Sequence, residues 1–500
     1  MEGKLQTEKR TRDYIAVDLG AGSGRVVVGR FGEAHVDFEE LHRFSNNPRL
    51  HDGHERWNVG ELLDGLTTGL AKISNSGRDV ISIGVDTWGV DYGLLDGRKR
   101  LIEDPICYRD NRTDGIVEHV HQLISRDELF RITGLQTLPL NTIYQLVAQR
   151  EAREWPLTAA HLLMMPDIVH HYLCGELVGE HTMASTTQLA SATTREWAPE
   201  VFECLGLPFE VMPPLMKPGS AIGKLRSHLQ RTLGLPPIGV VMPATHDTAS
   251  AVVGAPLQNN WAYISSGTWS LVGVETREPL LTEAVARENL TNEGGIDGTN
   301  RLLKNIMGLW ILESCRRVWA DNGTPIGYQT LAEELRAAPA RRAFIVPDMS
   351  RFFNPSNMPE EVRGFLRDSG QEVPDDPAWL ARVILESLAL RYGSIVRRIE
   401  RVTGRAIGGI QIIGGGAQNS FLNEATADAT NRVVQAGPVE ATAFGNLMVQ
   451  AIADGRFTDV TEAREFLARH VPVIHSEPSE QMEWAEARER YAQLETEFGF

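Results

Sequence analysis

Residues 14–30 read YIAVDLGAGSGRVVVGR: an apolar segment, a glycine-rich octapeptide from Asp18 to Arg25, and a second segment rich in β-branched residues. Apolar segments of this kind on either side of a glycine-rich turn predict a β-hairpin. The pattern recurs at residues 261–274, which read WAYISSGTWSLVGV. Two hairpins of one design in one chain predict a duplicated domain.

The segments between the two hairpins alternate between strand and helix patterns. Residues 80–85 form an apolar run that is typical of a buried strand, whereas residues 127–134 and 141–153 have helical spacing. Alternation of this kind predicts an α/β fold, and we place the boundary between the two halves near residues 254–260.

The second half continues the alternation. Asp376 and Pro377 are typical of a helix start and Gly404 of a helix end, so one long amphipathic helix is expected between them. A strand is expected at residues 410–413, and a surface helix at residues 480–498.

Composition and charge exclude several classes of protein. The chain has 500 residues, 42% hydrophobic and 23% charged, which is typical of a soluble globular protein with room for two large domains. Its net charge of −17 works against binding to nucleic acids or anionic membranes. It has no apolar run of about 18 residues that could span a membrane. Four cysteines without a C-x-x-C pair and a charged leader at residues 1–13 predict a reduced, cytoplasmic protein with a disordered start.

The glycine octapeptide offers backbone N–H groups to an anion. A dinucleotide fingerprint needs G-x-G-x-x-G at the start of a helix, but here the spacing is G-x-G-x-G and β-branched residues follow. The cofactor loop of S-adenosylmethionine-dependent methyltransferases is similar, yet it too should lead into a helix. A turn without a ligand explains neither Asp18 nor the later repeat, and the chain has no P-loop sequence.

Asp247 is the only Asp, Glu, Lys or Arg between Arg231 and Glu275. Burying a charge in such an apolar stretch is costly unless the group is hydrogen-bonded or has a task. Two hypotheses follow. Asp247 either caps a short helix at residues 248–253 or acts as a general base beside the glycine-rich loop.

Two further features of the sequence are candidate ligand sites. Gly414-Gly415-Gly416 lies between a predicted strand and a segment that looks helical from Asn419 onward, so it serves either as a close approach for a base or phosphate or as a plain turn. His51 with His54, and His170 with His171, could suggest a metal site. No third ligand stands at a recognised spacing, which favours surface or packing roles.

Taken together, the hairpin that starts at Asp18, its SSGT repeat, the isolated Asp247 and the Gly-Gly-Gly loop resemble the FGGY family of carbohydrate kinases. The resemblance covers about residues 13–475 and is strongest toward the members that act on L-rhamnulose. The motifs that carry it lie at residues 83–91, 108–110, 246–250, 291–295, 303–310 and 437–441.

The resemblance implies an α/β fold of two duplicated actin-like (ribonuclease H-like) domains with a catalytic cleft between them. Residues 14–254 are expected to form the sugar-side domain, residues 258–475 the nucleotide-side domain and residues 476–500 a C-terminal helix. The implied reaction is the phosphorylation of L-rhamnulose at O1 by ATP with Mg²⁺. A monomer is expected, with no nucleic-acid or membrane partner.

The resemblance also implies roles for single residues. Asp247 is expected to be the general base, and Asp18 to hold Mg²⁺ through water. Glu313 stands where family members carry Gln, and Gly22 stands where the resemblance predicts a hydroxyl residue. The nucleotide is expected to contact Ala21, Gly22, Ser23, Gly24, Arg25, Thr268, Glu313 and Gly416. The sugar is expected to contact Gly89, His246, Asp247, Thr248 and Asn305.

Three alternatives stay open at this point. The chain could phosphorylate another ketose or polyol, such as L-fuculose or xylulose, because sugar contacts can change while the nucleotide half stays the same. It could be a non-catalytic actin-like module or an ATP-driven chaperone, against which Asp247 and the sugar-side motifs argue. The remote alternative is a methyltransferase.

Overall fold

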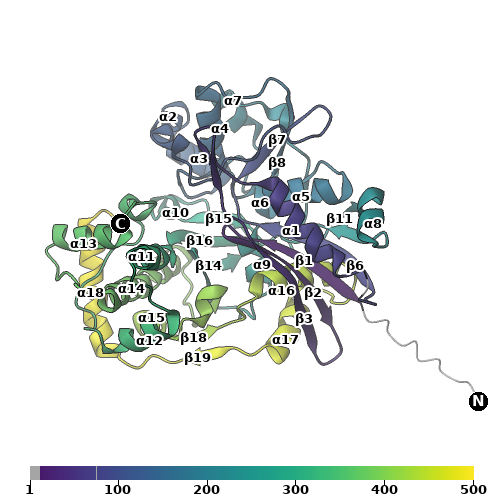
Figure 1. The fold of residues 1–500 in the computed structure, drawn as a ribbon. Helices are drawn as coiled ribbons and strands as arrows, with labels where there is room; N and C mark the ends of the chain where they lie inside the picture. The colour runs from purple at the N-terminus through teal and green to yellow at the C-terminus, as the bar shows by residue number, and fades with distance from the viewer. Residues whose placement is uncertain (1–11, 75) are drawn as a thin grey trace, which may run out of the picture. The chain divides into compact units, whose positions relative to one another are not determined.

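The computed structural model describes residues 12–74 and 76–500, which form two compact units (Figure 1). Unit 1 contains the described residues up to Ser125, residues 138–254 and residues 442–471. Unit 2 contains residues 126–137, 255–441 and 472–500.

Unit 1 is built on a six-stranded mixed sheet in the order β11-β12-β6-β1-β2-β3. Every residue of β1 is buried, since its sequence is apolar apart from one aspartate at each end and helices cover the sheet. The strands are β1 (Asp13–Leu19), β2 (Ser23–Phe31), β3 (Val36–Ser45), β6 (Val80–Thr87), β11 (Ala221–Lys224) and β12 (Gly239–Val241). Short strand pairs lie outside this sheet: β4 (Arg49–His51) with β5 (His54–Arg56), β7 (Tyr92–Asp96) with β8 (Ala159–Met164), and β9 (Gly179–Glu180) with β10 (Leu215–Met216). The helices are α1 (Val59–Ala71), α2 (Ile116–Leu123), α4 (Thr142–Glu151), α5 (Met165–Cys174), α6 (His181–Ala184), α7 (Pro199–Leu205), α8 (Ser227–Leu233), α9 (Asp247–Val253), α16 (Ala441–Ala453) and α17 (Val460–His470).

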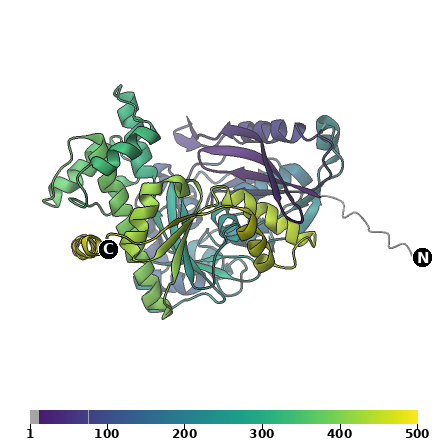
Figure 2. The ribbon, with the colours of Figure 1, turned by 90° about the horizontal axis from the view of Figure 1, so that it is seen from below.

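Unit 2 is built on a seven-stranded mixed sheet in the order β15-β16-β14-β13-β17-β18-β19. The strands are β13 (Trp261–Ser266), β14 (Trp269–Thr276), β15 (Thr291–Gly294), β16 (Asn300–Met307), β17 (Gly409–Ile413), β18 (Val433–Ala436) and β19 (Ile474–Ser476). The helices are α3 (Arg126–Thr133), α10 (Glu283–Arg287), α11 (Trp310–Asp321), α12 (Tyr328–Ala337), α13 (Met358–Asp368), α14 (Pro377–Thr403), α15 (Ser420–Thr430) and α18 (Gln481–Glu497). Figure 2 shows the C-terminal α18 end-on in yellow beside the C marker.

The two sheets repeat one topology, which confirms the predicted duplication. In unit 1, β1 pairs antiparallel with β2 and parallel with β6, and β6 pairs parallel with β12. In unit 2, β13 pairs antiparallel with β14 and parallel with β17, and β17 pairs parallel with β18. Each sheet also adds an antiparallel strand at both ends of this set: β3 and β11 in unit 1, β16 and β19 in unit 2. β15 is an extra edge strand of unit 2.

The long helix of the second half forms as predicted. Asp376 accepts a hydrogen bond from the Trp379 N–H, Pro377 opens α14, and Gly404 ends it in the left-handed conformation. Most residues of α14 are buried in the core of unit 2, and α14 packs closely on α15.

The compact units do not follow the expected division into residues 14–254 and 258–475. Two segments belong to the other unit than their neighbours in the sequence. Residues 126–137 belong to unit 2, and residues 442–471, with most of α16 and all of α17, belong to unit 1. In Figure 1 the yellow-green α16 and α17 therefore lie beside the purple strands β1 to β3. Gln450 of α16 fixes this packing, since its Nε2 donates to the Ile15 carbonyl at 2.9 Å and its Oε1 accepts from the Ser82 hydroxyl at 2.6 Å.

Arg12 and Asp13, which were expected to belong to a disordered leader at residues 1–13, are part of the fold, and residues 1–11 lie outside the described residues. Asp13 is the first residue of β1 and is wholly buried, with its carboxylate paired to Arg30 and Arg78. Arg12 forms an ion pair with Asp454 at 2.6 Å. Ion pairs therefore tie both Arg12 and Asp13 to unit 1.

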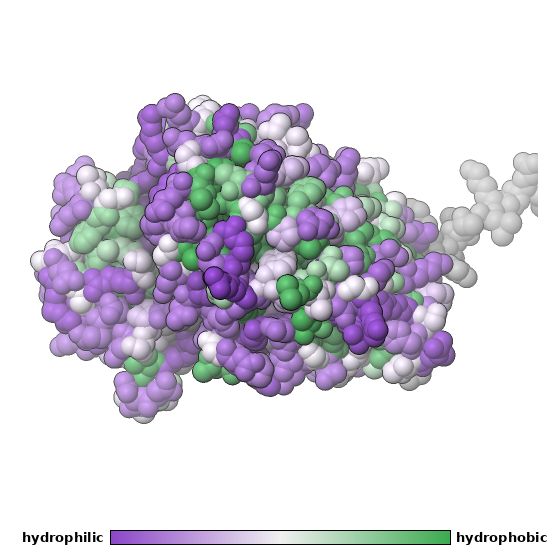
Figure 3. Space-filling model, turned by 90° about the horizontal axis from the view of Figure 1, so that it is seen from above, coloured by the Kyte–Doolittle hydropathy of each residue, from purple (hydrophilic) through white to green (hydrophobic). Residues whose placement is uncertain are grey.

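The surface is mixed in character. Figure 3 shows one face on which hydrophilic and hydrophobic side chains are interspersed. The large hydrophobic side chains that are exposed among the described residues are Leu50, Leu123, Leu157, Phe209, Ile474 and Met482. No helix in the described part of the chain combines the length and apolarity needed to cross a membrane.

Candidate active site

Three carboxylates of unit 1 meet at one edge of its sheet. Asp18 near the end of β1 pairs in parallel register with Asp86 of β6, and a β-bridge joins Thr87 to His246, the residue before Asp247. Burial raises the pKa of Asp86 well above its usual range, and the charges of Asp18 and Asp247 raise it further. The three carboxylates are thus close enough for their charges to interact. They lie at the carboxyl ends of parallel strands, which is where ligands usually bind to an α/β sheet.

Only one of the two carboxylate oxygens of Asp86 accepts a hydrogen bond among the described residues. Its Oδ2 accepts a hydrogen bond from Asn446 Nδ2 of α16 at 2.6 Å, whereas its Oδ1 is buried without a partner among the described residues. Asn446 is itself held by Gln450, whose Nε2 donates to the Asn446 Oδ1 at 2.7 Å. The unsatisfied oxygen marks a place where a further donor or cation would lower the energy.

The glycine turn is shorter than the sequence indicates, because Asp18 belongs to β1 and Ser23 to β2. The turn proper is Gly20 to Gly22, and a Cβ added at Gly22 would meet no atom within 4 Å, so a ligand can approach the backbone there. Arg25 lies opposite Asp18 and binds its Oδ2 through Nε at 2.9 Å and through a terminal nitrogen at 2.6 Å. A strand follows the turn, so the dinucleotide and methyltransferase interpretations, which need a helix there, are wrong.

Asp247 is the first residue of α9, and the N-cap position belongs to His246, which makes no side-chain cap. Asp247 Oδ1 accepts hydrogen bonds from its neighbour Thr248, from N at 2.5 Å and from Oγ1 at 3.2 Å. His246 Nε2 lies 3.4 Å from the same oxygen. The helix-cap hypothesis is therefore wrong in its simple form. Burial raises the pKa of Asp247 above its usual range, and His246 opposes that shift.

The loop at residues 88–91 is held by hydrogen bonds and close contacts. A Cβ added at Gly89 would lie 3.2 Å from Thr186 Oγ1 and 3.4 Å from His246 Nε2, so the expected sugar residues Gly89 and His246 are neighbours. Val90 has φ = 70°, which is strained for a β-branched residue. Its N–H donates to Thr186 and its carbonyl accepts from Thr142 Oγ1 at 2.7 Å, and these bonds hold the strained backbone.

A buried carboxylate organises the same loop. Asp91 Oδ2 accepts the indole N–H groups of Trp57 at 2.6 Å and Trp88 at 2.9 Å, and the two indole rings lie 4.3 Å apart. Burial raises the pKa of Asp91 to about 6, although the two indoles hold it down. Neither Asp86 nor Asp91 was singled out from the sequence, although both stand in the motif at residues 83–91.

We expect the tryptophan fluorescence of the protein to titrate with an apparent pKa of about 6. Lowering the pH through this value protonates Asp91, which weakens its acceptance of the Trp57 and Trp88 indole N–H groups. A fluorescence titration of the wild type and of Asp91→Asn measures this effect. An equal transition in the variant would assign the titration to another group.

In unit 2 the second hairpin turn is held by the start of α11. The carbonyls of Gly267 and Thr268 accept hydrogen bonds from the backbone N–H groups of Leu309 at 2.9 Å, Gly308 at 3.1 Å and Trp310 at 3.2 Å. A Cβ on Gly308 would lie 2.7 Å from the Gly267 carbonyl oxygen, so only glycine allows this approach. The position of Thr268 is thereby fixed by backbone contacts.

The Gly-Gly-Gly loop packs on this hairpin. Gly414 has φ = 82°, and a Cβ added at Gly416 would lie 2.0 Å from Ser266 Oγ. The loop therefore runs against the end of β13 and leads through a short 3₁₀ turn into α15, whose N-cap is Asn419. Within unit 2, Thr268 and Gly416 thus belong to two loops that touch at Ser266.

Asn305 lies on β16, two residues before the strand end that leads to Gly308. Gln136 binds it twice, since the Asn305 N–H donates to Gln136 Oε1 at 2.9 Å and Gln136 Nε2 donates to the Asn305 carbonyl at 3.2 Å. Glu293 Oε1 accepts from Asn305 Nδ2 at 3.3 Å and its other oxygen pairs with the buried Arg301. Gln136 comes from the segment that changes units, so no local signal pointed to it.

Glu313 stands in the first turn of α11, where its Oε2 pairs with Arg316 at 2.9 Å. The arginine offsets the negative charge that made this position unusual for a nucleotide contact. Among the histidines considered as metal ligands, His171 lies within hydrogen-bonding distance of two backbone carbonyls, whereas both ring nitrogens of His170 are buried without a hydrogen-bond partner among the described residues. His54 Nδ1 lies 3.1 Å from Asp110, and burial lowers the pKa of His170 to about 3. The described residues contain no group of three or more His, Cys, Asp or Glu side chains placed to hold a metal ion directly.

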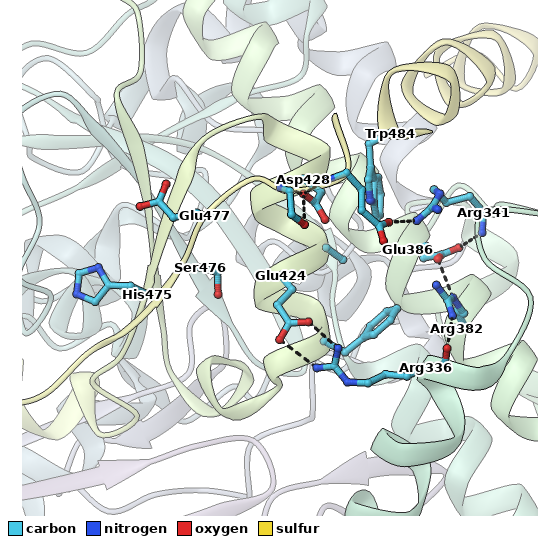
Figure 4. Close-up of a pocket in the computed structure, with 14 residues that line it drawn as sticks. Arg336, Arg341, Arg382, Glu386, Glu424, Asp428, His475, Ser476, Glu477 and Trp484 are labelled. Atoms are coloured by element: carbon cyan, nitrogen blue, oxygen red, sulfur yellow. Dashed lines mark hydrogen bonds and ion pairs between the residues drawn. The ribbon is translucent and has the colours of Figure 1, made fainter. Parts of the chain in front are cut away.

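A separate pocket of about 360 Å³ in unit 2 contains none of the predicted site residues (Figure 4). It lies among α12, α14, α15, β19 and the start of α18. Its three arginines are neutralised by carboxylates: Arg336 pairs with Glu424, Arg341 with Glu480, and Arg382 with Glu386. With its cations already paired, the pocket is not assigned to a phosphate.

Comparison with known proteins shows which family this sequence matches. Residues 14–254 match the N-terminal domain, and residues 262–453 the C-terminal domain, of the FGGY family of carbohydrate kinases. Curated proteins named rhamnulokinase are similar over most of their length. One from Bacteroides thetaiotaomicron is 41% identical over 95% of this chain and 97% of its own, and one from Pectobacterium carotovorum is 42% identical over 97% and 96%.

Solved structures share the fold at low sequence identity. A gluconate kinase from Lactobacillus acidophilus superposes with a TM-score of 0.80 at 15% identity, covering 97% of this chain and 98% of that one. A glycerol kinase from Plasmodium falciparum, solved with ADP, gives a TM-score of 0.73 at 15% identity, covering 96% and 98%.

Proposed function

Because the chain belongs to the FGGY family of carbohydrate kinases, we propose that it transfers the γ-phosphoryl group of ATP to O1 of L-rhamnulose. The names of its relatives at about 40% identity support this substrate. The observation that carries the proposal is Asp247, a carboxylate alone in an apolar stretch and set beside Asp18 and Asp86 at the carboxyl edge of the sheet. All four cysteines are free, as suits the cytoplasm, and we expect a monomer.

Asp247 acts as the general base. It accepts the proton of the substrate hydroxyl as the hydroxyl oxygen attacks the γ-phosphorus. Both hydrogen bonds from Thr248 go to Oδ1, which fixes the carboxylate and leaves Oδ2 to take the proton. The raised pKa makes Asp247 a stronger base than a free aspartate. Gly89 and His246 hold the sugar beside it, and Asn305 supplies a further contact.

The acidic residues fit a magnesium ion. Asp86 offers a buried oxygen without a partner among the described residues, and Asp18 lies beside it in the sheet. No ready-made cage of protein ligands is needed, because Mg²⁺ keeps several of its waters and takes few protein ligands. Asp18 and Asp86 would hold the hydrated ion. When bound, Mg²⁺ neutralises charge on the transferred phosphoryl group.

Backbone groups bind the nucleotide in this proposal. The octapeptide is proposed to face the ATP phosphates with Ala21 to Arg25. Its backbone donors are the N–H groups of Ala21 and Gly22 in the turn, because the residues from Ser23 onward belong to β2 and the Arg25 guanidinium is engaged by Asp18. Thr268 and Gly416 contribute from unit 2, where close backbone contacts fix both. Glu313 is also proposed to contact the nucleotide, because Arg316 offsets its negative charge. Preorganised donors of this kind stabilise phosphate charge without reorganisation during the reaction.

L-Rhamnulose is expected to give the highest kcat/KM in a panel of ketoses and polyols, because the motifs at residues 83–91 and 303–310 resemble those of enzymes that act on it. A coupled assay of ADP release across the panel, which includes L-fuculose, xylulose, ribulose and glycerol, measures this. Equal or better turnover of another member would overturn the substrate assignment but leave the kinase assignment standing. ATP consumption independent of any added sugar would overturn both.

A further inference from the structure

A further buried carboxylate is hydrogen-bonded to the catalytic segment, by which we mean Thr245 to Asp247. Glu180 ends β9 and is wholly buried in unit 1. Its carboxylate accepts four hydrogen bonds from two threonines: from Thr182 N at 2.8 Å and Thr182 Oγ1, and from Thr245 N at 2.9 Å and Thr245 Oγ1 at 2.8 Å. Four donors are as many as an ionised carboxylate usually accepts, and three of them here share Oε2.

These bonds lead directly to the proposed base. Thr245 precedes His246 and Asp247, and its carbonyl accepts the Thr87 N–H at 2.9 Å. Thr245 is therefore held from β6 on one side and from Glu180 on the other. Thr182 Oγ1, which donates to Glu180, also accepts the His246 N–H at 3.3 Å. The carboxylate is thus tied to the backbone of both residues that precede Asp247.

A purely local role accounts for only part of this network. Glu180 is the N-cap of α6, and its Oε1 accepts the Thr182 N–H in that role. The other three bonds go to Oε2, and two of these come from Thr245, which lies 65 residues further along the chain. One oxygen therefore caps the helix and the other holds the catalytic segment.

We propose that Glu180 is a positioning residue that holds Thr245 to Asp247 in the geometry needed for proton transfer. This inference rests on the proposed function, because it takes Asp247 as the general base. Both carboxylate oxygens are needed, since a glutamine has a single acceptor oxygen: it can keep either the helix cap or the bonds to Thr245, and it turns its NH₂ group against donors at the other end. Small displacements of a base from its working position reduce the rate steeply.

Glu180→Gln is expected to lower kcat for ketose phosphorylation by about 10- to 100-fold, the usual loss on removing a supporting group, while MgADP affinity stays as in the wild type. The decisive comparison is the double variant with Asp247→Asn. If Glu180 acts through Asp247, adding Glu180→Gln to Asp247→Asn reduces kcat no further, because groups that act as a unit are not additive.

Matched variants separate positioning from stability. Asp13→Asn removes another wholly buried, hydrogen-bonded carboxylate of unit 1 and is expected to lower the melting temperature while keeping kcat. Thr245→Ser keeps both donors to Glu180 and is expected to keep kcat. Thr245→Val loses the hydroxyl and is expected to lower kcat, and this pair serves as the test if Glu180→Gln does not fold.

The outcomes distinguish the two levels of the proposal. If Asp247→Asn is inactive while Glu180→Gln retains wild-type kcat, the positioning role of Glu180 is overturned and the general base stands. The same holds if the two losses multiply in the double variant, or if Thr245→Val behaves as Thr245→Ser. If Asp247→Asn itself retains wild-type kcat, the failure belongs to the proposed function.

Discussion

Asp247→Asn is expected to reduce kcat for ketose phosphorylation by about 10²- to 10⁴-fold, or roughly 3 to 5 kcal/mol of transition-state stabilisation. Asparagine keeps the shape and can still accept hydrogen bonds from Thr248, but it cannot take the proton of the attacking hydroxyl. MgADP affinity and melting temperature should stay near the wild-type values. kcat, calorimetric ADP affinity and thermal unfolding measured on one preparation test all three statements.

Asp454→Asn is a suitable control for this variant. It removes a carboxylate that pairs with Arg12 at the surface of unit 1 and accepts from Tyr14, away from the three carboxylates. It should leave kcat unchanged. If Asp247→Asn keeps more than about a tenth of the wild-type kcat, the loss falls below the usual range for a general base and Asp247 has another role.

Gly445→Ala is expected to damage both stability and activity. A Cβ at Gly445 of α16 would lie 1.7 Å from the Ser250 carbonyl oxygen of α9 and 2.9 Å from the Gly254 nitrogen. These are backbone atoms, so no side-chain rotation relieves the clash and the two helices must separate. We expect a loss of about 3 kcal/mol, the upper end for overpacking, and a fall in melting temperature of about 6 °C or more.

The kcat of Gly445→Ala should fall together with its stability. Asp247 is the first residue of α9, and a shift of this helix by about 1 Å is enough to cost about 10²-fold in rate. Gly97→Ala is the matched control, since a Cβ there meets no atom within 4 Å. Thermal unfolding and kcat for both variants test the contact. If Gly445→Ala behaves as Gly97→Ala does, α16 does not pack on α9 in this way.

The local elements were predictable because their signals lie within a few residues. The two hairpins, the strand at residues 80–85 and the capped helix α14 follow from turn, β-branched and capping residues that stand next to one another. The duplication was visible for the same reason, since each half begins with such a hairpin.

Long-range packing could not be predicted in this way. Nothing local to α16 indicates that Asn446 reaches Asp86, because the contact depends on a helix returning to the first unit. Gln136 is a similar case in the second unit. Asp86 carried a weak signal as a carboxylate in an apolar strand, the same property that drew attention to Asp247. Glu180 had none, because it stands among other polar residues.

The most direct test of the central claim is the identity of the phosphorylated product. ³¹P NMR of a reaction of the wild-type protein with L-rhamnulose and MgATP should show a new phosphomonoester at O1, the oxygen on the primary carbon C1. This ester should form at the same rate as ADP. The Asp247→Asn variant should form this ester at least about 10² times more slowly. Release of inorganic phosphate in place of the ester, or equal rates of ester formation by the two proteins, would contradict the account.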